Sequence, residues 1–331
     1  MNRSINGVLG SAFNAVVAAA NTAKHGLARQ MLKSPALWSL AMAPTAARLG
    51  VTVSRGGDDE PIEIRKDDRV VRIAARHRTY LWDVINAFDA YHAPVEPQLE
   101  DGRSVVDYSV PREHVLRPSG DRFYFTSLAE SDATAGLYAE MGRLGPGSVV
   151  IDGGAYCGAS AVLMGRIVGD RGQVIAFEPD AENYQAMLRN LAAHSATNVK
   201  TSPKGLWSRS GTVEFQSDGN MGSSILEASG RIASNVSSIP VMSIEDVVNE
   251  YGLERLDFVK LDIEGAEVPV LEASVDVLRR LRPRVIIEAH IVDGQLTTAP
   301  LCEILASIGY KSHLLLEFPG ATYHLVLGVP A

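Results

Sequence analysis

The feature that most constrains the fold is an apolar run that ends in an acid and a glycine-rich turn. Residues 149–151 are apolar, Asp152 and two glycines follow, and the small residues of a helix begin after Gly158. A second apolar run, residues 173–177, also ends in an acid, Glu178. A strand, a glycine-rich turn, a helix and a second strand that ends in an acid form the first βαβ unit of a nucleotide-binding sheet.

The turn indicates which nucleotide cofactor the sheet binds. A dinucleotide site has the spacing G-x-G-x-x-G and directs a helix N-terminus at a pyrophosphate. This turn lacks that spacing and starts with the carboxylate of Asp152, which repels a pyrophosphate but attracts an ammonium or a sulfonium. S-adenosylmethionine (SAM) carries both cationic groups. In the alternative interpretation Asp152 only caps the helix, but the spacing of both acids and the glycines favours SAM.

We therefore expect SAM to contact the turn and the ends of the second and third strands. Glu178 is placed to accept hydrogen bonds from both ribose hydroxyls. Trp207 follows the third strand, where adenine is usually bound, and it either stacks on adenine or packs as an ordinary core residue. The expected cofactor-binding residues are Asp152, Gly153, Gly154, Ala155, Tyr156, Gly158, Glu178, Pro179, Leu206 and Trp207.

Length and composition set the broad class of the protein. The 331 residues leave room for one large α/β domain and a smaller appendage. The formal net charge of −8 argues against nucleic acid as the main partner, because it leaves no basic stripe to neutralise phosphates. Two cysteines do not form a disulfide framework, so we expect a cytoplasmic location.

The N-terminal segment differs from the rest of the chain in its charge. Residues 1–57 contain no Asp or Glu, and apolar residues recur at helical spacing between Ile5 and Ala20. The apolar run is too short and too interrupted for a transmembrane helix or a cleaved signal peptide. Two interpretations are left for residues 1–50: a helix that docks on the catalytic domain or on a second copy of the chain, and a helix that lies on an anionic membrane surface.

The remaining pattern predicts the domain organisation. We expect an accessory region of helices and short strands over residues 1–100, and a Rossmann-like α/β domain with a doubly wound sheet over residues 101–331. Two strands that end the chain, residues 311–318 and 322–328, predict an antiparallel hairpin, as in SAM-dependent methyltransferases. A further hairpin is predicted between residues 104–109 and 123–125, and residues 216–238 are predicted to be a long loop over the site.

Three sequence blocks carry a resemblance to a known family. They are Ile151-Asp152-Gly153-Gly154-Ala155-Tyr156-Cys157-Gly158, Ala176-Phe177-Glu178-Pro179, and Val259-Lys260-Leu261-Asp262-Ile263-Glu264-Gly265-Ala266-Glu267. From Gly147 to about His290 the chain resembles the FkbM family of SAM-dependent methyltransferases. The third block is the most specific, and Tyr156 is a departure, because the family commonly has Asn there. The resemblance implies transfer of a methyl group to a hydroxyl of a sugar, a polysaccharide or a natural product.

The chemistry requires groups that remove a proton from the acceptor hydroxyl. In a doubly wound sheet such groups lie at the carboxyl ends of the strands, so the expected catalytic residues are Lys260, Asp262, Glu288 and His290. Asp262 or His290 acts as the base while Lys260 stabilises the alkoxide, or Asp262 and Glu288, with Glu264 or His290, bind a divalent cation such as Mg²⁺. Glu267 is expected only to favour the N-terminus of the following helix.

Two other functions are compatible with the sequence. An NAD-dependent Rossmann oxidoreductase would use the same βαβ unit and would tolerate replacement of Asp152 by glycine. A methyltransferase fold that has lost catalysis would serve as an assembly or membrane-docking module, and it would not bind SAM.

Overall fold

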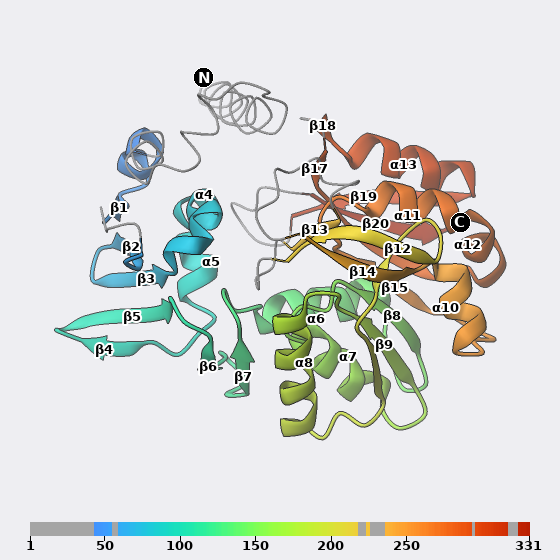
Figure 1. Ribbon diagram of the computed structural model, residues 1–331, viewed down its shortest axis with the longest axis horizontal. Helices are drawn as coiled ribbons and strands as arrows, with labels where there is room; N and C mark the ends of the chain where they lie inside the picture. The colour runs from blue at the N-terminus through green and yellow to red at the C-terminus, as the bar shows by residue number, and fades with distance from the viewer. Residues whose placement is uncertain (1–42, 55–58, 218–222, 226–235, 293–294, 317–323) are drawn as a thin grey trace.

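The computed structural model describes residues 43–331 except 55–58, 218–222, 226–235, 293–294 and 317–323. The helix predicted near the N-terminus, and with it the docking and membrane interpretations, therefore lies outside the described residues. Most of the loop predicted over residues 216–238 also does. The described residues form a small sheet at the N-terminal side and a larger α/β unit (Figure 1).

A seven-stranded sheet forms the centre of the larger unit. Its strand order is β10-β9-β8-β15-β16-β20-β19. The first five strands are parallel, and β20 runs antiparallel to both of its neighbours. The bounds are β8 Val149–Gly153, β9 Gln173–Phe177, β10 Val199–Ser202, β15 Phe258–Leu261, β16 Arg284–Ala289, β19 Tyr310–Leu315 and β20 His324–Pro330. This confirms the predicted Rossmann-like sheet and its terminal antiparallel hairpin.

Helices cover both faces of this sheet, which explains why the residues of its central strands β8 and β15 are buried on both faces. Successive residues of β8 enter different cores: Val150 packs in the core that contains α6, α7 and α8, and Ile151 packs with α10–α13. Ser131 caps the N-terminus of α6, and Asp180 caps the N-terminus of α8. The helices are α6 Asp132–Gly142, α7 Ala159–Val168, α8 Ala181–Ala193, α10 Ile244–Glu250, α11 Glu267–Ala273, α12 Val275–Leu281 and α13 Thr298–Ser307.

The N-terminal side of the described chain forms a five-stranded sheet with the order β1-β2-β3-β5-β4, which we call the accessory sheet (Figure 1). The pair β3–β5 is parallel, and the other pairs are antiparallel. The bounds are β1 Thr52–Val53, β2 Ile62–Lys66, β3 Arg69–Ile73, β4 Gln98–Glu100 and β5 Arg103–Tyr108. A 3-10 helix, η1 Ala75–Tyr80, and the helices α4 Leu81–Asn86 and α5 Phe88–His92 follow β3. The predicted boundary at residue 100 falls inside this sheet.

The hairpin predicted between residues 104–109 and 123–125 is wrong. The strand β5 pairs with β3 and β4, whereas β7 (Arg122–Phe125) pairs with β6 (Arg112–Val115). The alternation of side chains indicates which face of a strand is buried, but it does not select the partner strand. Buried side chains of the accessory sheet and of α6–α8 belong to one continuous core.

A four-stranded sheet with the order β11-β14-β12-β13 lies near the carboxyl end of β15. Its strands are β11 Gly205–Leu206, β12 Gly211–Gln216, β13 Ser224–Ile225 and β14 Val236–Met242. The described parts of residues 216–238 are thus partly strands, not only loop. None of the helices in the described part of the chain combines the length and hydropathy needed to cross a bilayer.

Candidate active site

One pocket lies where the strand ends of the seven-stranded sheet meet the four-stranded sheet. Its lining includes residues from the turn after β8, from the end of β9 and from the segment that follows β15. The side chains around it are carboxylates at two places and apolar groups between them. The lining residues are Gly154, Tyr156, Phe177, Glu178, Pro179, Asn183, Gly205, Leu206, Phe215, Ser223, Ile225, Asp262, Ile263 and Glu264.

Glu178 directly follows β9 and is held by the backbone on both sides. Its Oε2 accepts a hydrogen bond from the Tyr156 amide at 2.9 Å, and its Oε1 accepts one from the Asp180 amide at 2.9 Å. Burial raises the pKa of Glu178 to about 8, although these backbone hydrogen bonds act in the opposite direction. A buried carboxylate with a raised pKa in a pocket is typical of a functional site.

Asp152 lies beneath the pocket and not on its lining. The side chain is completely buried, and the sheet register places it beside Lys260, whose Nζ lies 3.4 Å from Asp152 Oδ1. The same Nζ donates a hydrogen bond to the Gly154 carbonyl at 2.6 Å and lies 3.6 Å from Asp262 Oδ2. Burial lowers the pKa of Lys260, but the two carboxylates outweigh burial and raise it, so the ammonium stays charged.

Neither oxygen of Asp152 has a hydrogen-bond partner of good geometry among the described residues. Two carboxylates, Asp152 and Asp262, share the single ammonium of Lys260 at this place. Two acidic groups therefore lie beside a single ammonium, and burial raises the pKa of Asp152.

The glycines of the turn are required by a close approach of two backbones. A Cβ atom on Gly154 would lie 1.8 Å from the carbonyl oxygen of Asp262, and the φ of Gly154 is +77°. Any side chain there would separate the turn after β8 from the segment after β15. Gly158, with a φ of +80°, similarly packs against Met187 of α8.

The N-terminus of α7 is already occupied by a carboxylate. Glu130 Oε2 accepts a hydrogen bond from the Ser160 amide at 3.2 Å, and its Oε1 accepts one from the Ser160 hydroxyl. In a dinucleotide site this helix end binds the pyrophosphate. A second anion in the same place would be repelled by Glu130 as well as by Asp152.

A cluster of ionisable groups lies at the ends of β15 and β16, and two of its members, Asp262 and Glu264, line the pocket. One ligand atom from each of Asp262, Glu288 and His290 lies within 4.8 Å of the others. The Nε2 atom of His290 is 3.7 Å from Asp262 Oδ1 and 3.8 Å from Glu264 Oε1. Burial lowers the pKa of His290, but the neighbouring carboxylates, first Glu267 and then Glu264, raise it well above its usual value.

Glu267 has a larger role than the sequence predicted. It is completely buried, and its Oε1 lies 2.9 Å from His290 Nδ1 and accepts a hydrogen bond from the Ile263 amide at 2.9 Å. Its Oε2 accepts a hydrogen bond from the Gly265 amide at 3.0 Å. Glu267 therefore fixes both the loop after β15 and the orientation of the imidazole. A third acid in the block from Asp262 to Glu267 was the only sequence signal for it.

The structure separates the predicted site residues into two groups. Those that line the pocket are Gly154, Tyr156, Glu178, Pro179, Leu206 and Asp262. Those that are not among its lining residues are Asp152, Gly153, Ala155, Gly158, Trp207, Lys260, Glu288 and His290. Trp207 packs in the core of the four-stranded sheet with Phe215 and Val241. This agrees with the alternative in which it is an ordinary core residue.

Several lining residues were not expected from the sequence. Asn183, in the first turn of α8, reaches the pocket, and its Oδ1 accepts a hydrogen bond from Thr126 Oγ1 at 2.7 Å. Ser223 also lines the pocket, and its hydroxyl donates to Asp180 Oδ2 at 2.8 Å. Neither residue belongs to a recognisable motif, because both reach the pocket through contacts distant in sequence.

Comparisons with known proteins agree with this geometry. The family described as "Methyltransferase FkbM domain" matches residues 152–312. A curated relative, the methyltransferase sdnD of Sordaria araneosa, is 28% identical over 185 residues, which are 47% of this chain and 71% of the relative. The family match includes Glu178, Asp262 and His290.

Solved structures similar to the chain are also methyltransferases. The methyltransferase FkbM of Methylobacillus flagellatus KT is 19% identical with a TM-score of 0.42, and the match covers 59% of this chain. The chain spans 50% of the length of that structure. The O-methyltransferase TomG of Streptomyces achromogenes, solved in complex with SAM, is 13% identical with a TM-score of 0.39, covering 61% of this chain and 81% of TomG.

Proposed function

Because residues 152–312 belong to the family of methyltransferase FkbM domains, we propose that the protein is a SAM-dependent O-methyltransferase. Its proposed acceptor is a hydroxyl of a sugar, a polysaccharide or a natural product. The observation that carries the proposal is the position of Glu178 and Asp262. The two carboxylates line the same pocket from β9 and β15, the strands on either side of β8.

The residues of the pocket fit the parts of SAM. Glu178, fixed by two backbone amides, is placed to accept the ribose hydroxyls. Leu206, Phe215 and Ile225 supply an apolar wall for a base. Asp262, an acid on the pocket lining, complements the ammonium and the sulfonium of SAM. SAM would supply the methyl group to be transferred.

Asp262 is the proposed proton acceptor for the acceptor hydroxyl. It lines the pocket, whereas Lys260, Glu288 and His290 are not among the lining residues. The side chain is 25% exposed and therefore within reach of a substrate. Lys260 Nζ and His290 Nε2 lie 3.6 Å and 3.7 Å from its two oxygens and hold the carboxylate in place.

A divalent cation such as Mg²⁺ is the competing activator. Asp262, Glu288 and His290 converge closely enough to hold one, and carboxylate oxygens suit Mg²⁺. A cation there would lower the pKa of a hydroxyl bound next to it. Methyl transfer by enzyme treated with EDTA, with and without added Mg²⁺, separates the two. Full activity in EDTA contradicts the cation and leaves Asp262 as the base.

The two alternative functions are supported less well. A dinucleotide would place its pyrophosphate at the N-terminus of α7, where Glu130 already binds Ser160. A module without catalysis would not need the buried charges of Asp152, Lys260 and His290, because burying charge is costly. Neither alternative is favoured by a specific contact.

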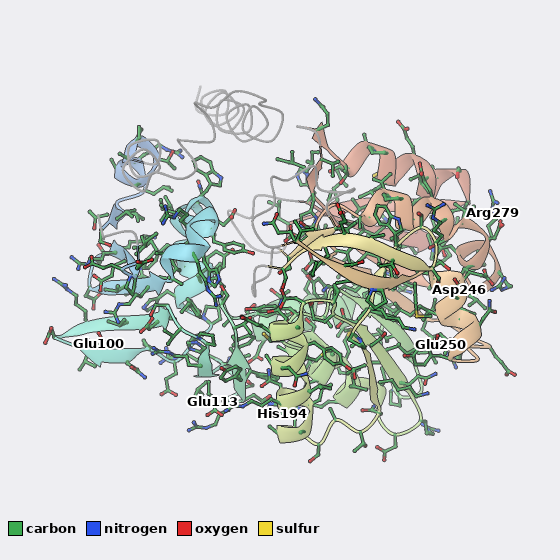
Figure 2. All side chains as sticks on the ribbon, in the orientation of Figure 1. Glu100, Glu113, His194, Asp246, Glu250 and Arg279 are labelled. Carbon is green, nitrogen blue, oxygen red and sulfur yellow. The ribbon has the colours of Figure 1, made fainter. Side chains whose placement is uncertain are left out.

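Calorimetric titration of the full chain with SAM, NAD and NADP tests the proposal. We expect SAM to bind and both dinucleotides to fail. Replacing Glu178 by Ala should weaken SAM binding about 100-fold, because the hydrogen bonds between its carboxyl group and the two ribose hydroxyls are lost. Glu100→Ala is the matched control, because Glu100 lies at the outer end of the accessory sheet, away from the pocket (Figure 2).

Two results would contradict the proposal. Equal SAM affinity of the wild type and of Glu178→Ala would show that the assigned pocket is not the SAM site. In a separate assay, release of S-adenosylhomocysteine should be measured with hydroxylated acceptors (sugars, polysaccharides and natural products) and with amine acceptors. Turnover only with amine acceptors would contradict O-methylation while leaving the SAM site intact.

A further inference from the structure

Tyr156 has an unusual conformation at the centre of the pocket turn. Its φ is +49°, a left-handed value that is uncommon for a bulky side chain. In this conformation its backbone amide donates a hydrogen bond to Glu178 Oε2 at 2.9 Å. The position of the Glu178 carboxylate therefore depends on the conformation of Tyr156.

The phenol of Tyr156 is anchored on the other side of the turn. Its hydroxyl donates to the Leu128 carbonyl at 3.1 Å and accepts a hydrogen bond from the Ser127 amide at 3.0 Å. Thr126 Oγ1 lies 3.2 Å from the phenol oxygen. Because a phenol hydroxyl has a single proton to donate, the contact with Leu128 uses its donor capacity. The side chain is 6% exposed, and its ring stacks on Phe125 with 6.1 Å between centroids.

The anchoring segment, residues 126–128, joins β7 to α6 and also contacts two other parts of the site. Ser127 Oγ lies 3.0 Å from His77 Nδ1 in η1, which follows the accessory sheet. Thr126 Oγ1 donates to Oδ1 of Asn183, a lining residue of the pocket. One short segment thus contacts the accessory side, the phenol and the pocket wall.

We propose that Tyr156 is a positioning residue: its hydroxyl anchors the pocket turn to residues 126–128 and thereby places Glu178 for the ribose. The inference rests on the proposed SAM site. Tyr156 is not assigned a part in the chemical step. Tyr156 acts through Glu178. Its backbone amide donates a hydrogen bond to Glu178, and its phenol hydroxyl binds the anchoring segment.

Tyr156→Phe tests the inference, because it keeps the ring and removes only the hydroxyl. We expect the Kd for S-adenosylhomocysteine, measured by calorimetry on the full chain, to rise about fivefold to tenfold. Tyr310→Phe is the matched control. Its buried hydroxyl also donates to backbone carbonyls, those of Leu278 and Pro283, but it does not line the pocket. The Kd of this control should stay within about twofold of the wild type.

A double-mutant cycle with Glu178→Gln separates positioning from a general loss of stability. If Tyr156 acts through Glu178, adding Tyr156→Phe to Glu178→Gln should change the Kd by less than about twofold. Effects that multiply, or a Tyr156→Phe variant that binds like Tyr310→Phe, would overturn the inference. Failure of the wild type to bind S-adenosylhomocysteine at all would instead refute the proposed function on which the inference rests.

Discussion

The accessory sheet and the seven-stranded sheet differ in the solvent exposure and pairing of their charged side chains. In the accessory sheet, Arg72 pairs with Glu63 at 2.9 Å, with Glu100 at 3.0 Å and with Asp107 at 3.4 Å. These side chains are partly exposed, so water completes their solvation. In the seven-stranded sheet, Asp152 and Lys260 are buried between helix layers, where water cannot do this.

The pKa shifts follow the same division. Partial burial raises the pKa of Glu63, but hydrogen bonds from Arg65 and Arg72 outweigh it and lower the pKa overall. For Glu178, burial is the larger influence, and the pKa rises to about 8. The accessory charges are mutually satisfied and stabilise the fold, whereas the buried charges at the strand ends are held in costly states that a ligand can relieve. This difference supports the strand ends as the proposed site.

The largest expected contrast between the two regions concerns glycine. Gly154→Ala should destabilise the protein by at least about 4 kcal/mol, because its Cβ would lie 1.8 Å from a backbone oxygen at a φ of +77°. Gly102→Ala, in the turn between β4 and β5, has a similar φ of +76° but open space around the Cβ, so about 1 kcal/mol is expected. Urea unfolding measures both. Equal losses would show that the close approach at Gly154 does not matter.

A second contrast concerns acids. Glu267→Ala should cost about 3 kcal/mol or more, because it leaves His290 and two backbone amides without their buried partner. Glu100→Ala removes a half-exposed ion pair to Arg72 and should cost about 1 kcal/mol or less. Free energies of unfolding in urea at neutral pH provide the comparison. A Glu267 variant no less stable than the Glu100 variant would contradict the role assigned to Glu267.

A third contrast concerns pH, and it is the smallest when taken over a single pH unit. The folded pKa of Glu178, about 8, lies above its usual 4.5, so the stability it contributes is present below 4.5 and is lost as the pH rises toward 8. The difference in unfolding free energy between the wild type and Glu178→Gln should therefore fall with pH, by at most about 1.4 kcal/mol per unit. For Glu63, whose pKa is lowered, stability is lost as the pH falls instead.

Urea unfolding between pH 5 and pH 8 tests the sign of this effect. The difference between the wild type and Glu63→Gln should stay constant over that range and shrink only below it. A difference for Glu178→Gln that grows with pH would show that the Glu178 carboxylate is ionised in the folded protein at neutral pH.

The seven-stranded sheet could be predicted from sequence because its signals are local. Three of the parallel strands, β8, β9 and β15, are short runs of mostly apolar residues that end in or are followed by an acid or a glycine, and helices lie between the strands along the chain. Pairing in the accessory region could not be predicted in the same way. Between residues 103 and 125 there are three strands with similar alternation, and only packing on the shared core decides that β7 pairs with β6 and not with β5.

The sequence by itself determined the βαβ unit, the acids that end its strands and the resemblance to FkbM methyltransferases, because each depends on short runs of consecutive residues. The tertiary structure decided which charges meet. Lys260 lies beside Asp152 through the register of β15 on β8, and Glu267 meets His290 across two elements. Tyr156 contacts residues 126–128 in the same manner. These contacts join residues far apart in the chain, and sheet register and core packing bring them together.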